Sequence, residues 1–549
     1  MARNILGATL VVSLLATTAL AAPKDSPPVT ATALSAHVKI LASDDFQGRK
    51  PGTEGENKAV AYIEDQFQKI GLKPVAGRYL QDVPMTEITS KVDGPLAVAI
   101  TAKDGGVQSH TYDYYSQMML WTRQRTDHAA VTDSEVVFVG YGITAPEFGW
   151  DDYAGVDVKG KTVLILVNDP GFATGDPKLF GGGAMTWYGR WPYKYEEAAR
   201  HGAAAAIIVH ETRAAGYPWG VVASSNAIPK LTLMPADGGL GSRSAIEGWV
   251  QLDVAKEMFQ AAGLDYGAIK DSAARRGFKA MPLPVKVSVG ITPAERDIVS
   301  HNVVGLIPGT KHPDEVVMVG AHWDHLGIGP AVNGDTIYNG ALDNASGIAG
   351  LIEMAKRYAK APKPERSVLF IAYTAEEQGL LGSEYYSQHP LFAPGKTVAG
   401  FNMDGLGVLG PVRDVVLVGG GKSDLEDSLR DWAKTHSKVV NGEPFPERGS
   451  YYRSDHFSLA KIGIPVVYAK SGIDSVANGA DWGRAKQDEF TRLHYHQPSD
   501  EWSADMDFTG GAADVNMLYD LSRGLATSDA WPKWYEKAEF RAVREQSQK

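Results

Sequence analysis

Short apolar runs that end in a charged residue or a histidine are the feature that most constrains how this 549-residue chain can fold. They recur through the second half of the chain, and each gives way to a turn. The runs are VVMVGAHWDH, NGALDNASG, VLFIAYTAEEQG, FNMDGLG and LHYHQPSDEW. Ligands gather beyond the carboxyl ends of the strands in open α/β sheets, so such ends can bring distant residues to one cleft.

Strand-like and helical segments alternate from about residue 298 onward. The strand-like segments include HNVVGLI, RSVLFIAYT, TVAGFNMDG and PVVYAK, and the helical ones include SGIAGLIEMAKRYAK and LEDSLRDWAKTHS. Apolar strands that alternate with helices predict a mostly parallel, twisted sheet with helices on both of its faces. The expected fold class is therefore α/β.

A second, inserted unit is predicted between residues 131 and 288, because the chain exceeds the usual size of a single domain. Short β runs with aromatic turns, such as VVFVGYGI and GKTVLILVNDPG, lack catalytic residue types at their ends. This pattern favours a separate, β-rich α/β domain. The other predicted segments are a signal peptide (1–22), an N-terminal part of the catalytic domain (30–130), the catalytic domain (289–530) and a C-terminal tail (531–549). We expect the last residues of the tail, WYEKAEFRAVREQSQK, to form a solvated helix or a fraying end.

The net charge indicates which partners the protein can bind, and the N-terminal sequence indicates where the protein is located. The formal net charge of -11 argues against a nucleic-acid partner, which would favour a basic surface. Arg3, an apolar stretch from Ile5 and small residues up to Ala22 are typical of a secretory signal. We therefore expect export to the periplasm or the extracellular space, with no membrane span after signal removal. The chain has no cysteine, so it can form neither disulfides nor a lipidated cysteine anchor.

Five residues near the ends of the runs are of the types that bind a pair of zinc-like ions. They are His322, Asp343, Glu377, Asp404 and His496, and Glu376 precedes one of them as a free carboxylate. Histidine and carboxylate ligands without thiolate suit zinc, and Co2+ or Mn2+ would also fit such a set. Two divalent ions close together need a shared anionic ligand, and a carboxylate such as that of Asp343 can give one oxygen to each.

The segments GAHWDH, LDNASG, TAEEQGLLGS, NMDGLG, SDHFSLAKIGIP and YHQPSDEW resemble, in order and spacing, those of the zinc aminopeptidases of peptidase family M28. The middle of the chain resembles the protease-associated (PA) domain of that family. The resemblance implies a zinc exopeptidase-like fold and a site for two Zn2+. In that site Asp343 would bridge the two ions. His322 and Asp404 would be the other ligands of one ion, and Glu377 and His496 would be the other ligands of the second.

Further residues are predicted to support this chemistry. Glu376 is expected to take a proton from the attacking water and to return it to the leaving amine. Asp324, two residues after His322 on the same strand face, can orient the ring of that histidine. Tyr451 and Tyr495 compete as donors to the oxyanion of the tetrahedral intermediate, and we favour Tyr451.

Some residues have more than one interpretation at this point. Asp500 fits equally well as a residue that orients His496 and as a helix cap before EWSADM. The segment Trp187–Trp191 is interpreted as packing, but it would form one wall of a specificity pocket if it lay over the cleft. The remaining histidines of interest are assigned to caps or solvated turns; these are His201, His210, His301 and His325.

The predicted function is that of an exported, zinc-dependent aminopeptidase that hydrolyses N-terminal residues from peptides. Three alternatives stay open: a glutaminyl cyclase-like enzyme, a carboxypeptidase of the same fold, and a non-catalytic, receptor-like protein. The inserted domain and a complete second metal shell through His322 and Asp404 argue against the cyclase, and retention of Glu376 argues against loss of catalysis. The preferred substrate residue, the native metal, the role of the PA domain and the oligomeric state do not follow from the sequence.

Overall fold

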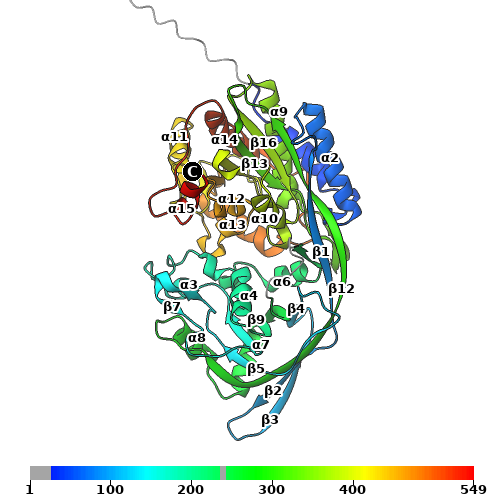
Figure 1. Cartoon of the computed structure of the whole chain (residues 1–549), viewed down its shortest axis with the longest axis vertical. Coiled ribbons are helices and arrows are strands. Elements are labelled where there is room, and N and C mark those ends of the chain that lie inside the picture. The colour runs from blue at the N-terminus through cyan, green and yellow to red at the C-terminus, as the bar shows by residue number, and fades with distance from the viewer. Residues whose placement is uncertain (1–25, 235–242, 549) are drawn as a thin grey trace, which may run out of the picture.

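A computed structural model of the chain describes residues 26–234 and 243–548, so the predicted signal peptide lies outside the described residues. The described elements form two lobes stacked along the longest axis of the molecule (Figure 1). None of the helices described is both long and apolar enough to span a membrane.

The upper lobe contains a sheet in which parallel neighbours dominate. Its strands follow the order β19-β18-β20-β17-β13-β16-β12. Strand β13 pairs in parallel with β16 and β17, and β17 pairs in parallel with β20, whereas β12 and β18 run antiparallel to their neighbours β16 and β20. The strands are β12 (Met281–Ile307), β13 (His312–His322), β16 (Arg366–Tyr373), β17 (Thr397–Asn402), β18 (Asp414–Leu417), β19 (Val439–Asn441) and β20 (Val466–Ser471). The predicted mixed α/β fold with a mostly parallel sheet is confirmed.

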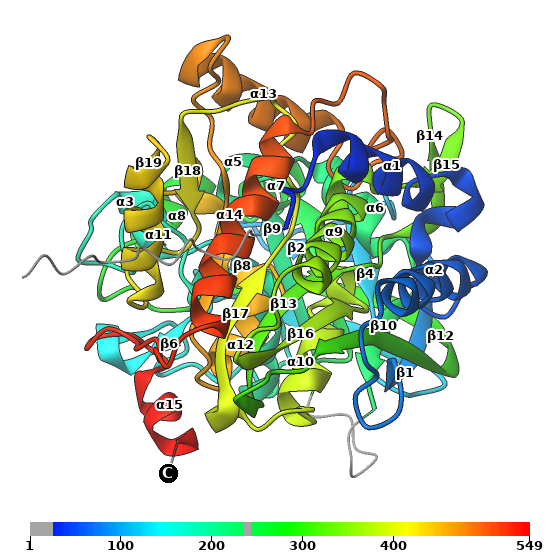
Figure 2. The same ribbon diagram turned by 90° about the horizontal axis from the view of Figure 1, so that it is seen from above.

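Both faces of this sheet are buried, because successive residues of β13 and β16 are apolar. Val317 and Val319 of β13 belong to one core cluster, and Val316 and Met318 belong to another. Helices α9 and α14 cover the first face, as the view from above shows (Figure 2). The helices on that face include α1 (Ala31–Leu41), α2 (Glu54–Ile70), α9 (Ser346–Lys360), α11 (Leu425–Thr435) and α14 (Thr509–Ala526), and those on the other include α10 (Leu381–Gln388) and α12 (His456–Lys461).

The lower lobe continues the same sheet through β12. Strands β5, β8, β9 and β11 pair in parallel, and β4 closes the edge antiparallel to β11. These strands are β4 (Met118–Trp121), β5 (Ala129–Phe138), β8 (Thr162–Leu166), β9 (Ala205–His210) and β11 (Ile246–Gln251). The helices of this lobe are α3 (Pro170–Thr174), α4 (Trp191–Arg200), α5 (Thr212–Ala215), α6 (Trp219–Asn226), α7 (Leu252–Ala261) and α8 (Tyr266–Ala273).

Strands β1 and β12 run side by side from one lobe to the other (Figure 1). Because β12 is continuous over 27 residues, the predicted domain boundary at residue 288 lies inside a strand. Residues 96–121, predicted with the N-terminal part of the catalytic domain, supply apolar side chains to the core of the lower lobe. They do so because β2 pairs with β12 and β4 pairs with β11. The added strands are β1 (Leu80–Val92), β2 (Leu96–Thr101), β3 (Val107–Tyr112) and β10 (Lys230–Leu233).

The C-terminal tail is packed onto the upper lobe rather than solvated. Trp534 and Phe540 join the core cluster that covers one face of the sheet. Arg544, on α15 (Arg541–Ser547), donates hydrogen bonds to the carbonyls of Pro394 and Thr397. The prediction of a solvated tail is therefore wrong, because two of its aromatic side chains are buried. The other described elements are β6 (Thr144–Ala145), β7 (Trp150–Asp151), β14 (Gly327–Val332), β15 (Asp335–Tyr338) and α13 (Gly479–Leu493).

A buried arginine holds together the loops at the carboxyl ends of the strands. The side chain of Arg49 is 1% exposed, and its guanidinium donates hydrogen bonds to backbone carbonyls. The acceptors are Trp323 at 2.8 Å, Leu41 at 2.7 Å, Asn339 at 2.7 Å and Gly340 at 2.9 Å. Arg49 thereby joins the N-terminal segment to the loop that follows β13 and to the loop that precedes α9.

We expect the substitution Arg49→Met to lower the free energy of unfolding by about 3–5 kcal/mol, because buried carbonyls lose a charged donor. Urea denaturation followed by circular dichroism measures this. The control is Arg78→Met, which removes an exposed arginine whose pair with Asp82 is solvated, and which should leave the midpoint unchanged. Equal midpoints for the two variants would contradict the role of Arg49 in holding these loops together.

Candidate metal centre

His322 is the last residue of β13 and is 1% exposed. Its Nδ1 lies 3.2 Å from the backbone carbonyl oxygen of Asp324 and 3.7 Å from the carboxylate Oδ1 of the same residue. A hydrogen bond from Nδ1 to that carbonyl places the ring proton on Nδ1 and leaves Nε2 free to bind a cation. Asp324 thus contacts the ring as expected, but through its backbone more closely than through its side chain.

The carboxylate of Asp324 has a different role, since it fixes the turn after β16. It accepts hydrogen bonds from the backbone N–H of Glu376 at 3.0 Å and of Glu377 at 3.3 Å. This turn is a short 3₁₀ helix, Glu376–Gln378, and it follows Ala375, whose φ of 52° is left-handed. One buried aspartate therefore positions both neighbouring glutamates at the end of a strand.

The carboxylate of Asp343 lies between two histidines. Its Oδ1 is 3.3 Å from Nε2 of His322, and its Oδ2 is 3.4 Å from Nε2 of His496. Each oxygen therefore faces one imidazole, which is the arrangement of a carboxylate that bridges two cations. Asp404, two residues beyond β17, also faces His322, with its Oδ1 at 3.7 Å from Nε2 of that histidine.

Asp500 holds the loop that carries Asp343. Its carboxylate accepts hydrogen bonds from the backbone N–H of Leu342 and of Asp343, both at 3.0 Å. The next described helix, α14, begins only at Thr509, so the helix-cap interpretation of Asp500 is wrong. No hydrogen bond between the side chain of Asp500 and the ring of His496 is present among the described residues. Sequence spacing pointed to the nearest histidine, whereas the fold turns Asp500 towards a loop that is distant along the chain.

His325 was assigned to a cap or a solvated turn, and this assignment is wrong. The ring is 1% exposed, and its Nδ1 lies 2.6 Å from Oε1 of Glu377. The other oxygen of Glu377, Oε2, lies 3.0 Å from Nε2 of His496. His325 therefore orients a carboxylate of the site, and its position three residues after His322 in HWDH was the signal that could have revealed it. His210 is also buried, with Nε2 at 3.0 Å from the carbonyl of Tyr217.

The lower lobe contributes directly to the ring of His496. Ser225, at the end of α6, places its Oγ 2.7 Å from Nδ1 of His496. When Nδ1 donates to this hydroxyl, Nε2 carries no proton and is available to a metal. The two residues are 271 positions apart, so nothing in the sequence around either residue indicated the contact.

The donors fit a pair of cations. Nε2 of His322 and Nε2 of His496 are buried, face carboxylate oxygens and make no hydrogen bond with any described residue. A cation between each nitrogen and its carboxylates would satisfy these atoms. Two alternative sets of donors, each within 4.8 Å, can also be drawn: His322 with Glu376 and Asp404, and His325 with Asp343 and Glu377. We favour the set with Asp343 between the ions, because its two oxygens face two different imidazoles.

Comparison with known proteins identifies this part of the chain. The model of peptidase family M28 matches residues 302–518, the segment that contains all five predicted ligands. Residues 302–518 belong to peptidase family M28. The chain is 38% identical over 217 residues to aminopeptidase YwaD from Bacillus subtilis, a match of 37% of this chain and 39% of that protein. The chain is 27% identical over 240 residues to the probable lipoprotein aminopeptidase LpqL from Mycobacterium tuberculosis, a match of 41% of this chain and 45% of that protein.

These matches span less than half the length of the curated relatives. A solved structure extends the likeness in fold beyond the M28 domain. An aminopeptidase from Aneurinibacillus sp. strain AM-1 superposes with a TM-score of 0.53 at 20% identity, over 91% of this chain and 95% of that one. At this level of identity the likeness shows the fold alone.

Burial and neighbouring charges shift the pKa values of the acids and histidines in the M28 site. Burial, with the nearby charges of Glu377 and Asp404, raises the pKa of Glu376 well above its usual range. Although burial opposes ionisation, the charges of His496 and His325 lower the pKa of Glu377 to about 2. In His496, burial favours the neutral ring, but Glu377 and Asp343 raise the pKa to about 9. Such crowding of buried acids around histidines is what divalent cations would neutralise.

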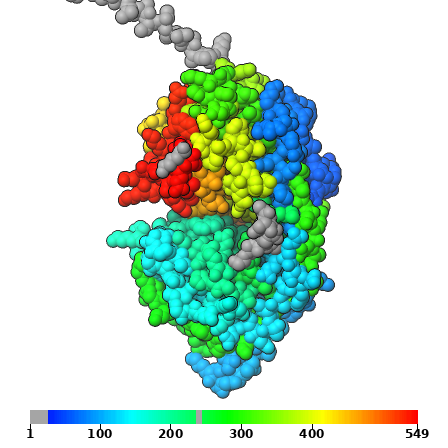
Figure 3. All heavy atoms as spheres, viewed as in Figure 1, coloured from blue at the N-terminus to red at the C-terminus, as the bar shows by residue number. Residues whose placement is uncertain are grey.

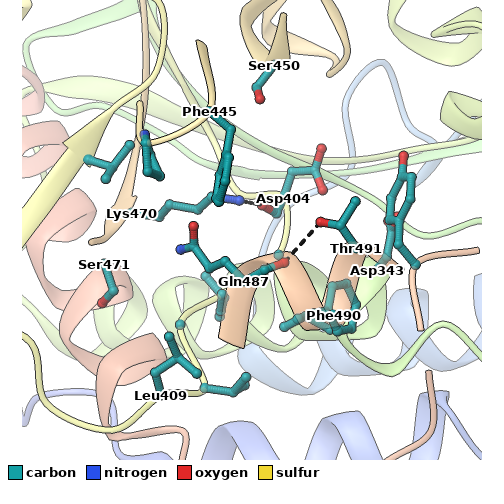
Figure 4. A pocket seen from close by; sticks show the side chains of 18 of the residues that line it. Asp343, Asp404, Leu409, Phe445, Ser450, Lys470, Ser471, Gln487, Phe490 and Thr491 are labelled. Carbon is teal, nitrogen blue, oxygen red and sulfur yellow. Dashed lines mark hydrogen bonds between the residues drawn. The ribbon is translucent and has the colours of Figure 1, made fainter. Parts of the chain in front are cut away.

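Two cavities meet at Glu376 of the M28 domain. The first, of about 470 Å³, lies within the upper lobe and is lined largely by apolar side chains, including Phe445 and Phe490 (Figure 4). In this cavity Lys470 donates a hydrogen bond to the carbonyl of Asp404 at 3.0 Å. The second, of about 940 Å³, lies between the lobes, where the surface is hollowed, and is lined by many charged side chains (Figure 3).

The two tyrosines that compete for the oxyanion are placed differently. Tyr495 lines both cavities, its ring stacks on His496 at 3.8 Å between centroids, and its hydroxyl accepts a hydrogen bond from Arg453 at 2.7 Å. The hydroxyl of Tyr451 is buried without a partner among the described residues, and its ring packs against His456 instead of lining either cavity. The geometry therefore favours Tyr495 over Tyr451.

We expect Ser225→Ala to weaken the affinity of the protein for zinc by about 10-fold or more, because His496 loses the partner that fixes its ring. Competition with a fluorescent zinc chelator measures the dissociation constant. The control is Ser224→Ala, one position earlier, whose hydroxyl donates to the carbonyl of Gly220 within α6 and accepts a hydrogen bond from Gln497 at 3.3 Å, but makes no hydrogen bond with the ring of His496. The role assigned to Ser225 would be contradicted by equal zinc affinities in the two variants.

Proposed function

We propose that the protein is a zinc-dependent aminopeptidase that removes N-terminal residues from peptides. The observation that carries this proposal is the carboxylate of Asp343 between His322 and His496, with Glu376 beside it at the meeting point of two cavities. The names of the relatives, aminopeptidase YwaD and probable lipoprotein aminopeptidase LpqL, support the same activity.

We assign two Zn2+ to this site. Asp343 would bridge them, His322 and Asp404 would hold one, and Glu377 and His496 the other. Bound there, such ions would lower the pKa of a bound water towards about 7 and polarise the scissile carbonyl. Their positive charge would also oppose the upward shift that burial imposes on the pKa of Glu376.

Glu376 is the proposed general base. The backbone N–H of Glu376 donates a hydrogen bond to Asp324 at 3.0 Å. Glu376 is 9% exposed, so the residue is largely held out of bulk water at the cleft. It would accept a proton as the water oxygen bonds to the carbonyl carbon, and would deliver that proton to the amide nitrogen as the C–N bond breaks. Tyr495 would donate its hydroxyl proton in a hydrogen bond to the oxyanion, while Arg453 keeps that hydroxyl in place.

We further propose that the enzyme acts after export. The support is the basic, apolar and small-residue sequence of residues 1–22, which is typical of a secretory signal. We propose the periplasm or the extracellular space as the location.

The activity can be tested by mass spectrometry of a peptide mixture, half with free and half with acetylated N-termini, incubated with the zinc-loaded protein. We expect stepwise loss of N-terminal residues from the free peptides alone, and loss of this activity on chelation with recovery on addition of Zn2+. Release from the C-terminus would instead establish a carboxypeptidase. Loss of ammonia from N-terminal glutamine without cleavage would establish a cyclase.

The substitution Glu376→Gln should lower kcat by about 100- to 10,000-fold, because the water loses its proton acceptor. The zinc content, measured by elemental analysis, should stay at the level of the unmodified protein, because Glu376 is not among the proposed ligands. A matched control is Glu384→Gln, which alters a glutamate that lines the cavity between the lobes but lies outside the proposed catalytic residues. Retained activity in Glu376→Gln would refute its assignment as the base.

A further inference from the structure

Arg190 is a buried cation that has no side-chain partner among the residues that the structure describes. The residue precedes α4 in the lower lobe, and it is 7% exposed. Its Nε is buried without a hydrogen-bond acceptor, and its guanidinium makes no hydrogen bond or ion pair with any described residue. A buried charge costs free energy unless an opposite charge or hydrogen-bond acceptors compensate it, and none of the described residues supplies such a group to Arg190.

Other cations that line the cavity between the lobes have partners. Arg200 lies 2.5 Å from Glu197, Arg123 lies 3.7 Å from Glu247, and Lys461 lies 3.9 Å from Glu384. Lys230 donates to the carbonyl of Ser225 and to the side chain of Asn226. Arg190 therefore differs from its neighbours in the same cavity, and its lack of a partner does not follow from a general excess of positive charge there.

Arg190 lies close to the catalytic residues. It lines the cavity between the lobes together with Glu376, Arg453 and Tyr495. Burial and the neighbouring charge of Arg453 together lower the pKa of Arg190 to about 10, so the group remains charged at neutral pH. The segment Trp187–Trp191, interpreted from its sequence as packing, thus forms a wall of the cavity and directs positive charge towards it.

A peptide whose scissile bond lies at Glu376 would extend into both cavities. Glu376 lines both, so a carbonyl beside it has one side of the substrate in each cavity. The apolar cavity within the upper lobe suits the side chain of the N-terminal residue. The leaving part of the peptide would then lie between the lobes, on the side of Arg190.

We propose that Arg190 binds a carboxylate carried by the leaving part of the substrate, and that the protein is selective for peptides that present one there. This inference rests on the proposed function. Arginine pairs with carboxylates through two parallel hydrogen bonds, and the unpaired guanidinium offers this geometry. The carboxylate can come from two sources: the C-terminus of a dipeptide, or the side chain of Asp or Glu in the second position of a longer peptide.

The unmodified zinc-loaded protein tests the proposal with four substrates: Leu-Gly, Leu-Gly-amide, Leu-Glu-amide and leucine p-nitroanilide. We expect kcat/KM for at least one carboxylate-bearing substrate to exceed that for Leu-Gly-amide by about 10- to 100-fold, as for loss of a charged hydrogen bond. A higher kcat/KM for Leu-Gly than for Leu-Gly-amide would show that Arg190 binds the C-terminal carboxylate. A higher kcat/KM for Leu-Glu-amide would show that it binds the carboxylate of the side chain.

The remaining outcomes separate the two proposals. Equal values for Leu-Gly, Leu-Glu-amide and Leu-Gly-amide would overturn the role of Arg190 and leave the aminopeptidase activity intact. Failure to hydrolyse any of the four substrates, including leucine p-nitroanilide, would overturn the proposed function and this inference with it.

Substitutions of Arg190 test whether this residue causes the preference for substrates that carry a carboxylate. In Arg190→Gln, the ratio of kcat/KM for the preferred acid to that for Leu-Gly-amide should fall to about one, and Arg190→Lys should restore part of it. Arg200→Gln, which removes a paired arginine from the same cavity, should keep the ratio of the unmodified protein. The ratio is insensitive to the fraction of folded protein, so an equal loss of both rates in Arg190→Gln would show a structural role and contradict the proposal.

Discussion

The rest of this structure depends on one constraint: carboxylates crowd around two imidazole nitrogens that make no hydrogen bond with any residue that the structure describes. Burial disfavours charge at each acid, so the site is stable only when cations or protons neutralise it. The surrounding residues hold the donors in place through hydrogen bonds to atoms that do not face the cleft. Asp324 and Asp500 accept backbone N–H groups, and Arg49 donates to the carbonyls of the same loops. These contacts fix the loops while leaving the Nε2 atoms of His322 and His496 available.

Both lobes contribute residues to the site, because one continuous sheet passes through both and holds them together. Strand β12 carries the backbone from the lower lobe to the edge of the upper sheet, where it pairs with β16. The lower lobe thereby reaches the centre with Ser225, which contacts His496, and with Arg190, which lines the second cavity. The segment predicted as an inserted domain therefore contributes to the orientation of a proposed ligand and to the wall of the cleft, whatever further role it has.

The accuracy of sequence-based prediction depended on how local the signal was. The parallel sheet followed from apolar runs that alternate with helices, because burial on both faces leaves a direct trace in each strand. The predicted ligands converge for the same reason, since the carboxyl ends of β13, β16 and β17 meet at one edge. The predictions for His325 and Asp500 were wrong because the local sequence around a single polar residue in a turn does not show whether that residue is solvated or buried. The tail was expected to be solvated because the burial of Trp534 and Phe540 depends on a surface formed by distant strands.

The sequence by itself determined the fold class and the chemistry of the donors, because strand periodicity and residue types are written along the chain. Only the tertiary structure decided which atoms face the cleft, since that choice depends on partners far away in sequence. The carboxylate of Asp343 lies between two histidines because Asp500 holds its loop, and His496 is oriented by a serine 271 positions earlier. The importance of Arg190 emerged only from the fold, which buries it in the same cavity as Glu376 and gives it no ion pair with a described residue. Long-range contacts of this kind arise from chain topology, and no local pattern of residues encodes them.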